Sequence, residues 1–316
     1  MNRKKMLFIF LFSFIAYYWS RPHLSKPSQI AKLYPNKDLN KELNKMTKLG
    51  ANSIEKHKKS NLKPITKTPL ISNNGKFLNA NMQINEKDFK SRDAVPFINH
   101  HGMAVAYGDV LIGSLNDNVS KGYAKPPEVN YWPNSTIYYH IQPNIQNPER
   151  ILKAFNYLSE KTVLNFIPYE DGIMDAIVFE PTDKNCLSYI GRITGTQPIF
   201  ISPECDWYHI VHEILHAVGL IHEHSRPDRN RYITIDWSNI PEIYHSQFEI
   251  LPETLVRDWL KYDYDIHSIM HYGSQILKEE HKGTSLHLIN GGDIPEPSEL
   301  SSLDIQKIND LFQGRN

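Results

Sequence analysis

The chain has 316 residues, of which 40% are hydrophobic and 11% aromatic, enough for one globular domain plus an extension or for two small domains. Lysine and arginine balance aspartate and glutamate at 35 each, so no net charge favours nucleic acid or a membrane surface as a partner. Two cysteines are too few for a fold that rests on a framework of disulfides.

Residues 1–20 have the pattern of an export signal. A positively charged start precedes an apolar run, Met6 to Trp19, which is too short to span a bilayer comfortably as a helix. No clear Ala-x-Ala cleavage site follows, so an uncleaved membrane anchor is the alternative. We expect an exported chain, secreted or held at a membrane by this segment, with no later membrane span.

The segment from residue 21 to about 70 is polar and rich in lysine. It has too little apolar surface to offset its ordering entropy, so we expect it to be largely disordered or weakly helical. A basic tail for nucleic acid is the alternative. The aromatic residues that would stack on bases are nearly absent, and we therefore expect no nucleic-acid partner.

Apolar residues return after Phe77 and are densest in residues 102–113, around the sequence Tyr107-Gly108-Asp109-Val110. A Gly-Asp pair taken alone most often marks a turn. The hydrophilic stretch 120–129 is typical of an exposed linker, where proteases cut. We therefore divide the chain into an N-terminal segment, residues 21–121, and a folded domain, residues 122–316.

The folded domain begins with a predicted strand at Ile137–Ile141, rich in β-branched and aromatic residues. Asn147 is expected to cap a helix that has Pro148 in its first turn. The buried face of that helix is predicted to carry Ile151, Leu152, Phe155 and Leu158. Further strands are expected at Thr162–Ile167, Ala176–Phe179 and Gln197–Ser202.

Asp206 is predicted to cap a helix that runs to about Val218 and carries the strongest pattern in the chain, His-Glu-x-x-His-x-x-Gly-x-x-His at residues 212–222. Its first two histidines lie one helical turn apart, and neutral imidazole is a good zinc ligand. The glycine can end the helix and turn the chain, bringing His222 to the metal. A lone His-x-x-x-His pair would favour a buried helix with chance histidines, but the full string does not.

Two further patterns follow. Residues 265–273 contain Ser-x-Met-His-Tyr-Gly, with Met270 and Tyr272. Residues 300–314 predict a closing helix that begins at Ser301 with Asp304 as its capping partner.

Together these segments resemble the astacin family of metzincin zinc endopeptidases. Glu223 and the continuation at residues 224–233 narrow the resemblance to astacins, although Asn230 stands where astacins usually have Asp. The resemblance covers roughly Trp132 to Phe312. It implies an α+β fold, with a two-lobed protease domain that contains a mixed β-sheet and the zinc helix and is preceded by a propeptide.

The resemblance also implies roles for the residues that match. One zinc per chain would be held by His212, His216 and His222. Glu213 would be the general base that takes a proton from the attacking water, and Tyr272 would donate to the oxyanion. The expected supporting residues are Met270, beneath the imidazoles, and Glu223, which would meet the N-terminus freed by activation.

The resemblance further pairs Cys186 with Cys205 in a loop disulfide, with two free thiols as the alternative. A second astacin disulfide is missing, because Val163 and Gly314 occupy its positions. The sequence around Asp109 resembles the propeptide element whose aspartate displaces the catalytic water, which predicts a zymogen switch. In the family, the strand that corresponds to residues 197–202 lies at the sheet edge above the zinc, where it can hold a peptide.

The sequence therefore predicts a secreted zinc endopeptidase made as a zymogen, with protein or peptide substrates and an undetermined oligomeric state. A catalytically silent zinc-binding module on a protease scaffold is the alternative. Its signature would be loss of the general base, yet Glu213 and Tyr272 are present. An enzyme acting only on chain ends would need a clamp for a terminal charge, and none is recognisable. The remaining histidines, including His100, His101, His209, His224 and His245, are expected to be surface or structural residues.

Overall fold

The computed structural model describes residues 95–115, 121–124, 126–277 and 283–313, all within one structural unit, Pro69–Asn316. The expected export signal, residues 1–20, and the basic segment that follows it lie outside the described residues. Every helix in the described ranges is too short or too polar to cross a membrane.

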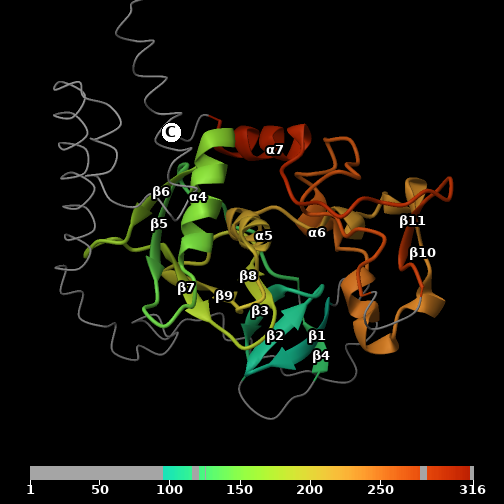
Figure 1. Ribbon diagram of the computed structural model, residues 1–316, viewed down its shortest axis with the longest axis horizontal. Helices are drawn as coiled ribbons and strands as arrows, with labels where there is room; N and C mark the ends of the chain where they lie inside the picture. The colour runs from blue at the N-terminus through green and yellow to red at the C-terminus, as the bar shows by residue number, and fades with distance from the viewer. Residues whose placement is uncertain (1–94, 116–120, 125, 278–282, 314–316) are drawn as a thin grey trace, which may run out of the picture. The chain divides into compact units, whose positions relative to one another are not determined.

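A mixed sheet runs through the described part in the order β4-β1-β2-β3-β8-β9-β7-β5-β6 (Figure 1). Three strands come from the N-terminal segment, β1 (Val95–His100), β2 (Met103–Ala106) and β3 (Val110–Ser114), and β4 (Lys121–Ala124) crosses the expected boundary with the folded domain. Five come from the folded domain: β5 (Thr136–Ile141), β6 (Asn165–Pro168), β7 (Ala176–Pro181), β8 (Cys186–Tyr189) and β9 (Thr196–Ile201). The resulting α+β architecture agrees with the fold class predicted from the sequence.

The pairing of the strands corrects two sequence-based expectations. The resemblance implies that β9 lies at the sheet edge, but β9 is paired on both sides, parallel to β7 and antiparallel to β8. The edge of the folded domain's own sheet is β8, and β3 of the N-terminal segment pairs with it in parallel. Residues 121–124, expected within an exposed linker, form β4 and pair with β1, so a boundary at Gly122 would cut through a strand.

The helices are α4 (Glu149–Lys161), α5 (Trp207–Val218), the short α6 (Glu253–Val256) and α7 (Ser302–Phe312). Helix α4 buries Ile151, Phe155 and Leu158, as the spacing predicts, but Leu152 is 45% exposed. Asn147 does not cap α4: its φ is 51° and Pro148 takes the N-cap position. The strand expected from Thr162 begins only at Asn165, because Thr162 is the C-cap of α4.

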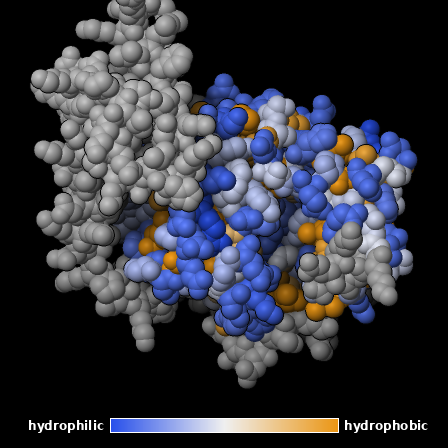
Figure 2. Space-filling model, in the orientation of Figure 1, coloured by the Kyte–Doolittle hydropathy of each residue, from blue (hydrophilic) through white to orange (hydrophobic). Residues whose placement is uncertain are grey.

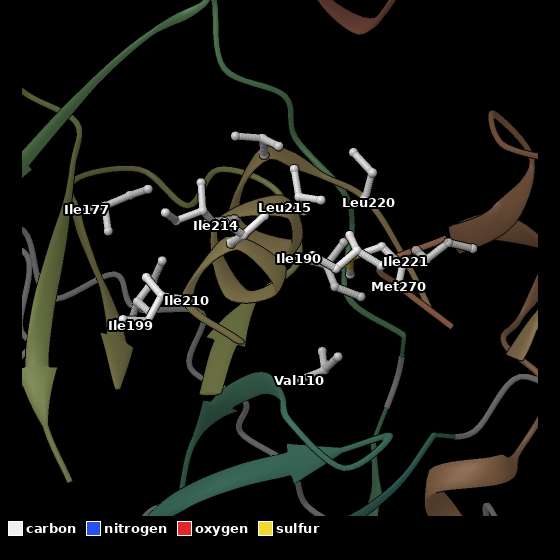
Figure 3. Close-up of a cluster of buried hydrophobic side chains, with 14 of the residues drawn as sticks. Val110, Ile177, Ile190, Ile199, Ile210, Ile214, Leu215, Leu220, Ile221 and Met270 are labelled. Carbon is white, nitrogen blue, oxygen red and sulfur yellow. The ribbon is translucent and has the colours of Figure 1, made fainter. Parts of the chain in front are cut away.

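The core of the domain lies between the helices and the sheet. Figure 3 shows apolar side chains of α5, such as Ile210 and Ile214, beside Ile177 and Ile199 of the sheet. Val110 of β3 belongs to the same buried cluster, so the N-terminal segment shares this core. Over the face drawn in Figure 2, the described surface is mostly hydrophilic, with separate hydrophobic patches.

The part of the chain after α5 has little regular structure. It contains the two-stranded sheet of β10 (Ile233–Ile235) and β11 (Leu286–Leu288), short 3-10 turns, and a second buried cluster around Phe248 and Tyr264. Helix α7 returns to the first lobe, with a capping box between Ser301 and Asp304 as predicted. The two regions correspond to the two lobes expected of the fold.

The predicted disulfide between Cys186 and Cys205 is present and joins the start of β8 to the loop before α5. Hydrogen bonds connect the α4 region to the C-terminal part of the described chain. The backbone N–H of Val163 donates to Oδ1 of Asn309 at 3.0 Å, and that of Leu300 donates to the Tyr157 hydroxyl at 2.8 Å.

Candidate active site

Helix α5 holds the first two motif histidines in fixed positions. Asp206 is its N-cap, and the Asp206 backbone N–H donates to Nδ1 of His209 at 3.0 Å. Gly219 ends the helix with φ 119°, a conformation that glycine adopts at low cost. A β-carbon at Gly219 would lie 2.7 Å from the ring of Tyr131, so close packing as well as backbone geometry favours glycine there.

The three motif imidazoles converge on one point. Nε2 of His222 lies 3.1 Å from Nε2 of His212 and 3.2 Å from Nε2 of His216. The Nδ1 atoms of His212 and His216 lie 2.9 Å from the carbonyl oxygens of Ile269 and Leu220. If each Nδ1 carries the proton and donates to its carbonyl, the Nε2 lone pairs point at each other, which is stable only around a cation.

This geometry fits zinc. With Zn–N bonds of about 2.0–2.1 Å in a tetrahedral arrangement, the ligand atoms would be separated by about 3.3–3.4 Å. The observed separations of 3.1 and 3.2 Å are close to that value. Because α5 supplies two imidazoles and the turn after Gly219 supplies the third, the motif at residues 212–222 builds most of a metal site from one short stretch of chain.

Asp109 lies at the fourth corner of this group. Its carboxylate oxygens are 3.3 Å from Nε2 of His222 and 3.5 Å from those of His212 and His216, and its side chain is only 16% exposed. Burial opposes the charge on Asp109, but the three imidazoles around it hold the pKa of its carboxyl well below the ordinary value. The carboxylate is therefore charged and available as a ligand.

Backbone pairing places Asp109 at this corner. The Asp109 carbonyl accepts from the backbone N–H of Ser188 at 3.0 Å, directly before β3 pairs with β8. Gly108 packs against the site from the same turn, and a β-carbon there would lie 2.6 Å from the Tyr272 hydroxyl oxygen. The fourth corner of the histidine group is thus occupied by the turn that precedes β3.

Glu213 is buried beside Asp109, at 2% exposure. Its Oε2 atom has no hydrogen-bond partner among the described residues. Burial, and then the negative charge of Asp109, raise the pKa of the Glu213 carboxyl well above its ordinary value. While Asp109 is in place, its charge therefore favours the protonated form of Glu213.

Tyr272 packs against two of the histidines. Its ring centroid is 5.2 Å from that of His222, and its ring stacks on His224 at 3.9 Å. Burial, followed by the charges of Asp109 and Glu213, raises the pKa of the Tyr272 phenol, so the group stays a hydrogen-bond donor. His224 is buried and supports Tyr272, a structural role of the kind expected from the sequence.

The loop with Met270 is fixed by the C-terminal helix. Asp304 accepts from the Ser268 hydroxyl at 2.6 Å and from the Ile269 backbone N–H at 2.8 Å. Met270 is buried in the main core (Figure 3), and its carbonyl accepts from the Glu223 backbone N–H at 2.9 Å. The capping residue of α7 thus also holds the segment that carries Tyr272, a link that capping rules alone do not reveal.

Glu223 is already paired on both carboxylate oxygens. Oε1 accepts from Nη1 of Arg226 at 2.9 Å and from the Asp265 backbone N–H at 3.0 Å, and Oε2 accepts from Nζ of Lys307 at 2.8 Å. The side chains of Glu223 and Lys307 are 2% and 3% exposed. No pattern in the sequence points to Lys307, because its contact with Glu223 comes from tertiary packing. With the N-terminal segment in place, both carboxylate oxygens of Glu223 are therefore occupied.

A cleft of about 770 Å³ opens beside these residues. Its lining includes Asp109, Glu213, Tyr272 and Gln247, and it extends to Lys184 and Asn185 before β8. The motif residues His212 and Glu213 therefore face a space that is large enough for part of a peptide.

The mixed sheet, the zinc helix and this donor set define the scaffold of a metzincin-type zinc metalloprotease. The comparisons identify the family. The model of the Astacin peptidase family matches residues 125–313, and the chain belongs to this family.

Individual relatives agree with this assignment. Zinc metalloproteinase nas-13 of Caenorhabditis elegans is 31% identical over 243 residues, covering 75% of this chain and 52% of that protein. Zinc metalloproteinase nas-7 of the same species is 34% identical, covering 57% and 48%. High choriolytic enzyme 1, a hatching enzyme zinc-protease from medaka, matches with a TM-score of 0.51 at 27% identity, covering 58% of this chain and 94% of that structure. The chain spans about half the length of these two curated relatives.

Proposed function

We propose that this protein is an exported zinc endopeptidase made in a latent form, with the N-terminal segment as its inhibitor. The observation that carries the proposal is the meeting of Asp109 with three convergent imidazoles, next to a buried glutamate in an open cleft. Relatives named as zinc metalloproteinases support it. An export signal at residues 1–20 and the disulfide are consistent with a secreted protein.

In this proposal His212, His216 and His222 hold one zinc ion per chain. Bound zinc would polarise both a water molecule and the carbonyl group of the substrate. Three imidazoles leave one position open for chemistry, and the carbonyl contacts of His212 and His216 keep their rings oriented.

Glu213 is the proposed general base. Once Asp109 leaves, the nearby negative charge that opposes ionisation of Glu213 is gone, and the carboxylate can take the proton of the attacking water and pass it to the leaving amine. The Tyr272 phenol can donate a hydrogen bond to the oxygen of the attacked carbonyl, because its raised pKa keeps it protonated.

Latency follows from the position of the N-terminal segment. β3 occupies the edge of β8, where an extended substrate could otherwise add as a strand, and Asp109 takes the open corner of the histidine group. The segment is not cut there, because Asp109 fills the position that the attacking water would need. We place the protease domain after β4, near residue 125, where the family match begins.

The test is peptide cleavage by the full-length protein. The activating cut, which we expect between Ser120 and Lys125, is blocked by Lys121→Gln and Lys125→Gln. In that background Asp109→Ala should raise activity, and Asp171→Ala, at an exposed position, should not. Equal rates for Asp109→Ala and its parent would mean that Asp109 does not block the site. Mapping the products on an unfolded protein separates cuts at internal bonds from cuts at chain ends.

A further inference from the structure

A second group of metal-ligating side chains lies away from the candidate active site. His100 and His101 belong to the hairpin that joins β1 to β2, and Asp183 belongs to the loop after β7. Nε2 of His101 is 3.3 Å from Oδ1 of Asp183. One ligand atom from each of the three residues lies within 4.8 Å of the others.

The turn itself gives no reason for a histidine at position 101. His100 pairs with Met103, so His101 and Gly102 are the two central residues, with φ of 50° and 83°. Such a two-residue turn favours Asn-Gly, because both positions need positive φ. The turn is also stabilised independently of the imidazoles: the Gly102 backbone N–H donates to Oδ1 of Asn99 at 2.8 Å. Asparagine, not histidine, is the residue that this turn type favours at position 101.

His100 adds an unexplained polar atom. Its Nε2 is buried and has no hydrogen-bond partner among the described residues. Burial, and then the neighbouring His101, lower the pKa of His100, so the ring is neutral near pH 7. Buried ring nitrogens nearly always have a partner, so the described residues leave a polar group of this hairpin unsatisfied.

We propose that His100, His101 and Asp183 bind a divalent metal ion of the zinc class, with water completing its coordination. Two imidazoles and one carboxylate are a favourable donor set for such an ion. An exposed His–Asp pair without metal would contribute little, since the side chains of His101 and Asp183 are 69% and 67% exposed.

This site would regulate the latency of the protease. This role depends on the protease function proposed above. Two ligands come from the inhibitory segment and one from the protease domain, so the ion links one to the other. A metal ion that binds only while the hairpin is docked on the protease domain shifts the equilibrium toward the docked state. At free zinc about 100-fold above the dissociation constant, the hairpin should open about 100-fold less often. Zinc would thus delay release of the segment after the activating cut.

The first experiment measures zinc per chain by equilibrium dialysis of full-length protein in buffered zinc. His101→Asn is the main variant, because asparagine suits the turn but is a poor zinc ligand. Asp183→Asn is the second variant, and His267→Ala removes an exposed histidine outside the cluster as the control. Wild type and His267→Ala should each bind one more zinc than His101→Asn and Asp183→Asn. Equal zinc content in all four proteins would overturn the proposal.

The second experiment measures amide hydrogen exchange of residues 95–106 with and without added zinc. Exchange in wild type should slow by about 100-fold at free zinc about 100-fold above the dissociation constant, and exchange in His101→Asn should not change. A zinc effect of the same size in His101→Asn would also overturn the proposal. The dialysis result separates the two sites. One zinc in every protein would support the catalytic site and contradict the site at His100, His101 and Asp183. One zinc in wild type and none in His101→Asn would support the second site and contradict the catalytic one.

Discussion

Replacing Lys307 with methionine tests how the C-terminal helix supports the candidate active site. Lys307 places a charged nitrogen 2.8 Å from Oε2 of Glu223, and both side chains are almost fully buried. Glu223 directly follows His222, so its position affects the third imidazole. Lys307→Met keeps the approximate length of the side chain and removes the charge.

The expected loss of stability depends on which hydrogen bonds Glu223 keeps in the variant. Loss of one partner of a buried ion pair typically costs about 3–5 kcal/mol. Oε1 of Glu223 keeps its hydrogen bonds from Arg226 and the Asp265 backbone, whereas Oε2 loses the one from Lys307. We therefore expect the lower end, a loss of about 3 kcal/mol in the free energy of unfolding. Lys161→Met, at an exposed position, should change stability by no more than about 0.5 kcal/mol.

The assay is urea unfolding of full-length protein in a Glu213→Ala background, which prevents self-digestion. Combining Lys307→Met with Glu223→Gln should recover about 1 kcal/mol or more, because the charge left behind is then also removed. The reasoning would be refuted by a Lys307→Met protein as stable as Lys161→Met, or by a double variant no better than the single one.

Three other predictions address the site and its surroundings. Glu213→Ala should retain zinc, measured by elemental analysis, but lose orders of magnitude in peptide cleavage by the activated protein; efficient cleavage would show that another group is the base. Removing the disulfide between Cys186 and Cys205, which are separated by 19 residues, with a double serine variant should cost about 3 kcal/mol in urea unfolding, and free thiols in the unreduced exported protein would argue that the bond does not form. Gly108→Ala should raise the activity of uncut full-length protein, because the added carbon would collide with the Tyr272 hydroxyl; unchanged latency would contradict the close fit of this turn.

The features that sequence predicts well are those set by neighbouring residues. The zinc helix from Asp206 to Val218 and the capping box of α7 follow from spacing and capping rules, and the structure has both. The fold class and the disulfide follow from the resemblance to astacins and are present as well. The convergence of the three imidazoles is also predictable, since helix pitch and one glycine turn bring them together.

The features that sequence misses depend on partners that are distant in the chain. Residues 197–202 do form a strand, but nothing in them reveals that β8 lies outside β9. The hydrophilic residues 121–124 join the sheet because β1 offers them an edge. The pairing of Lys307 with Glu223 likewise depends on where α7 docks. Of the apolar residues of α4 that the spacing assigns to one buried face, Leu152 alone stays exposed, at 45%.

The parallel pairing of β3 with β8 also bears on the order of events during folding. The proposed zinc ligands lie within residues 212–222, the disulfide closes a short loop, and β1, β2 and β3 form a local meander. By contrast, β3 must find β8 across the intervening α4 and several strands, and such distant contacts form late because closing a long loop is entropically costly. We therefore expect the histidine cluster to assemble before Asp109 reaches it. A newly made chain would then pass through a brief interval in which its metal site is formed and its inhibitor has not yet docked.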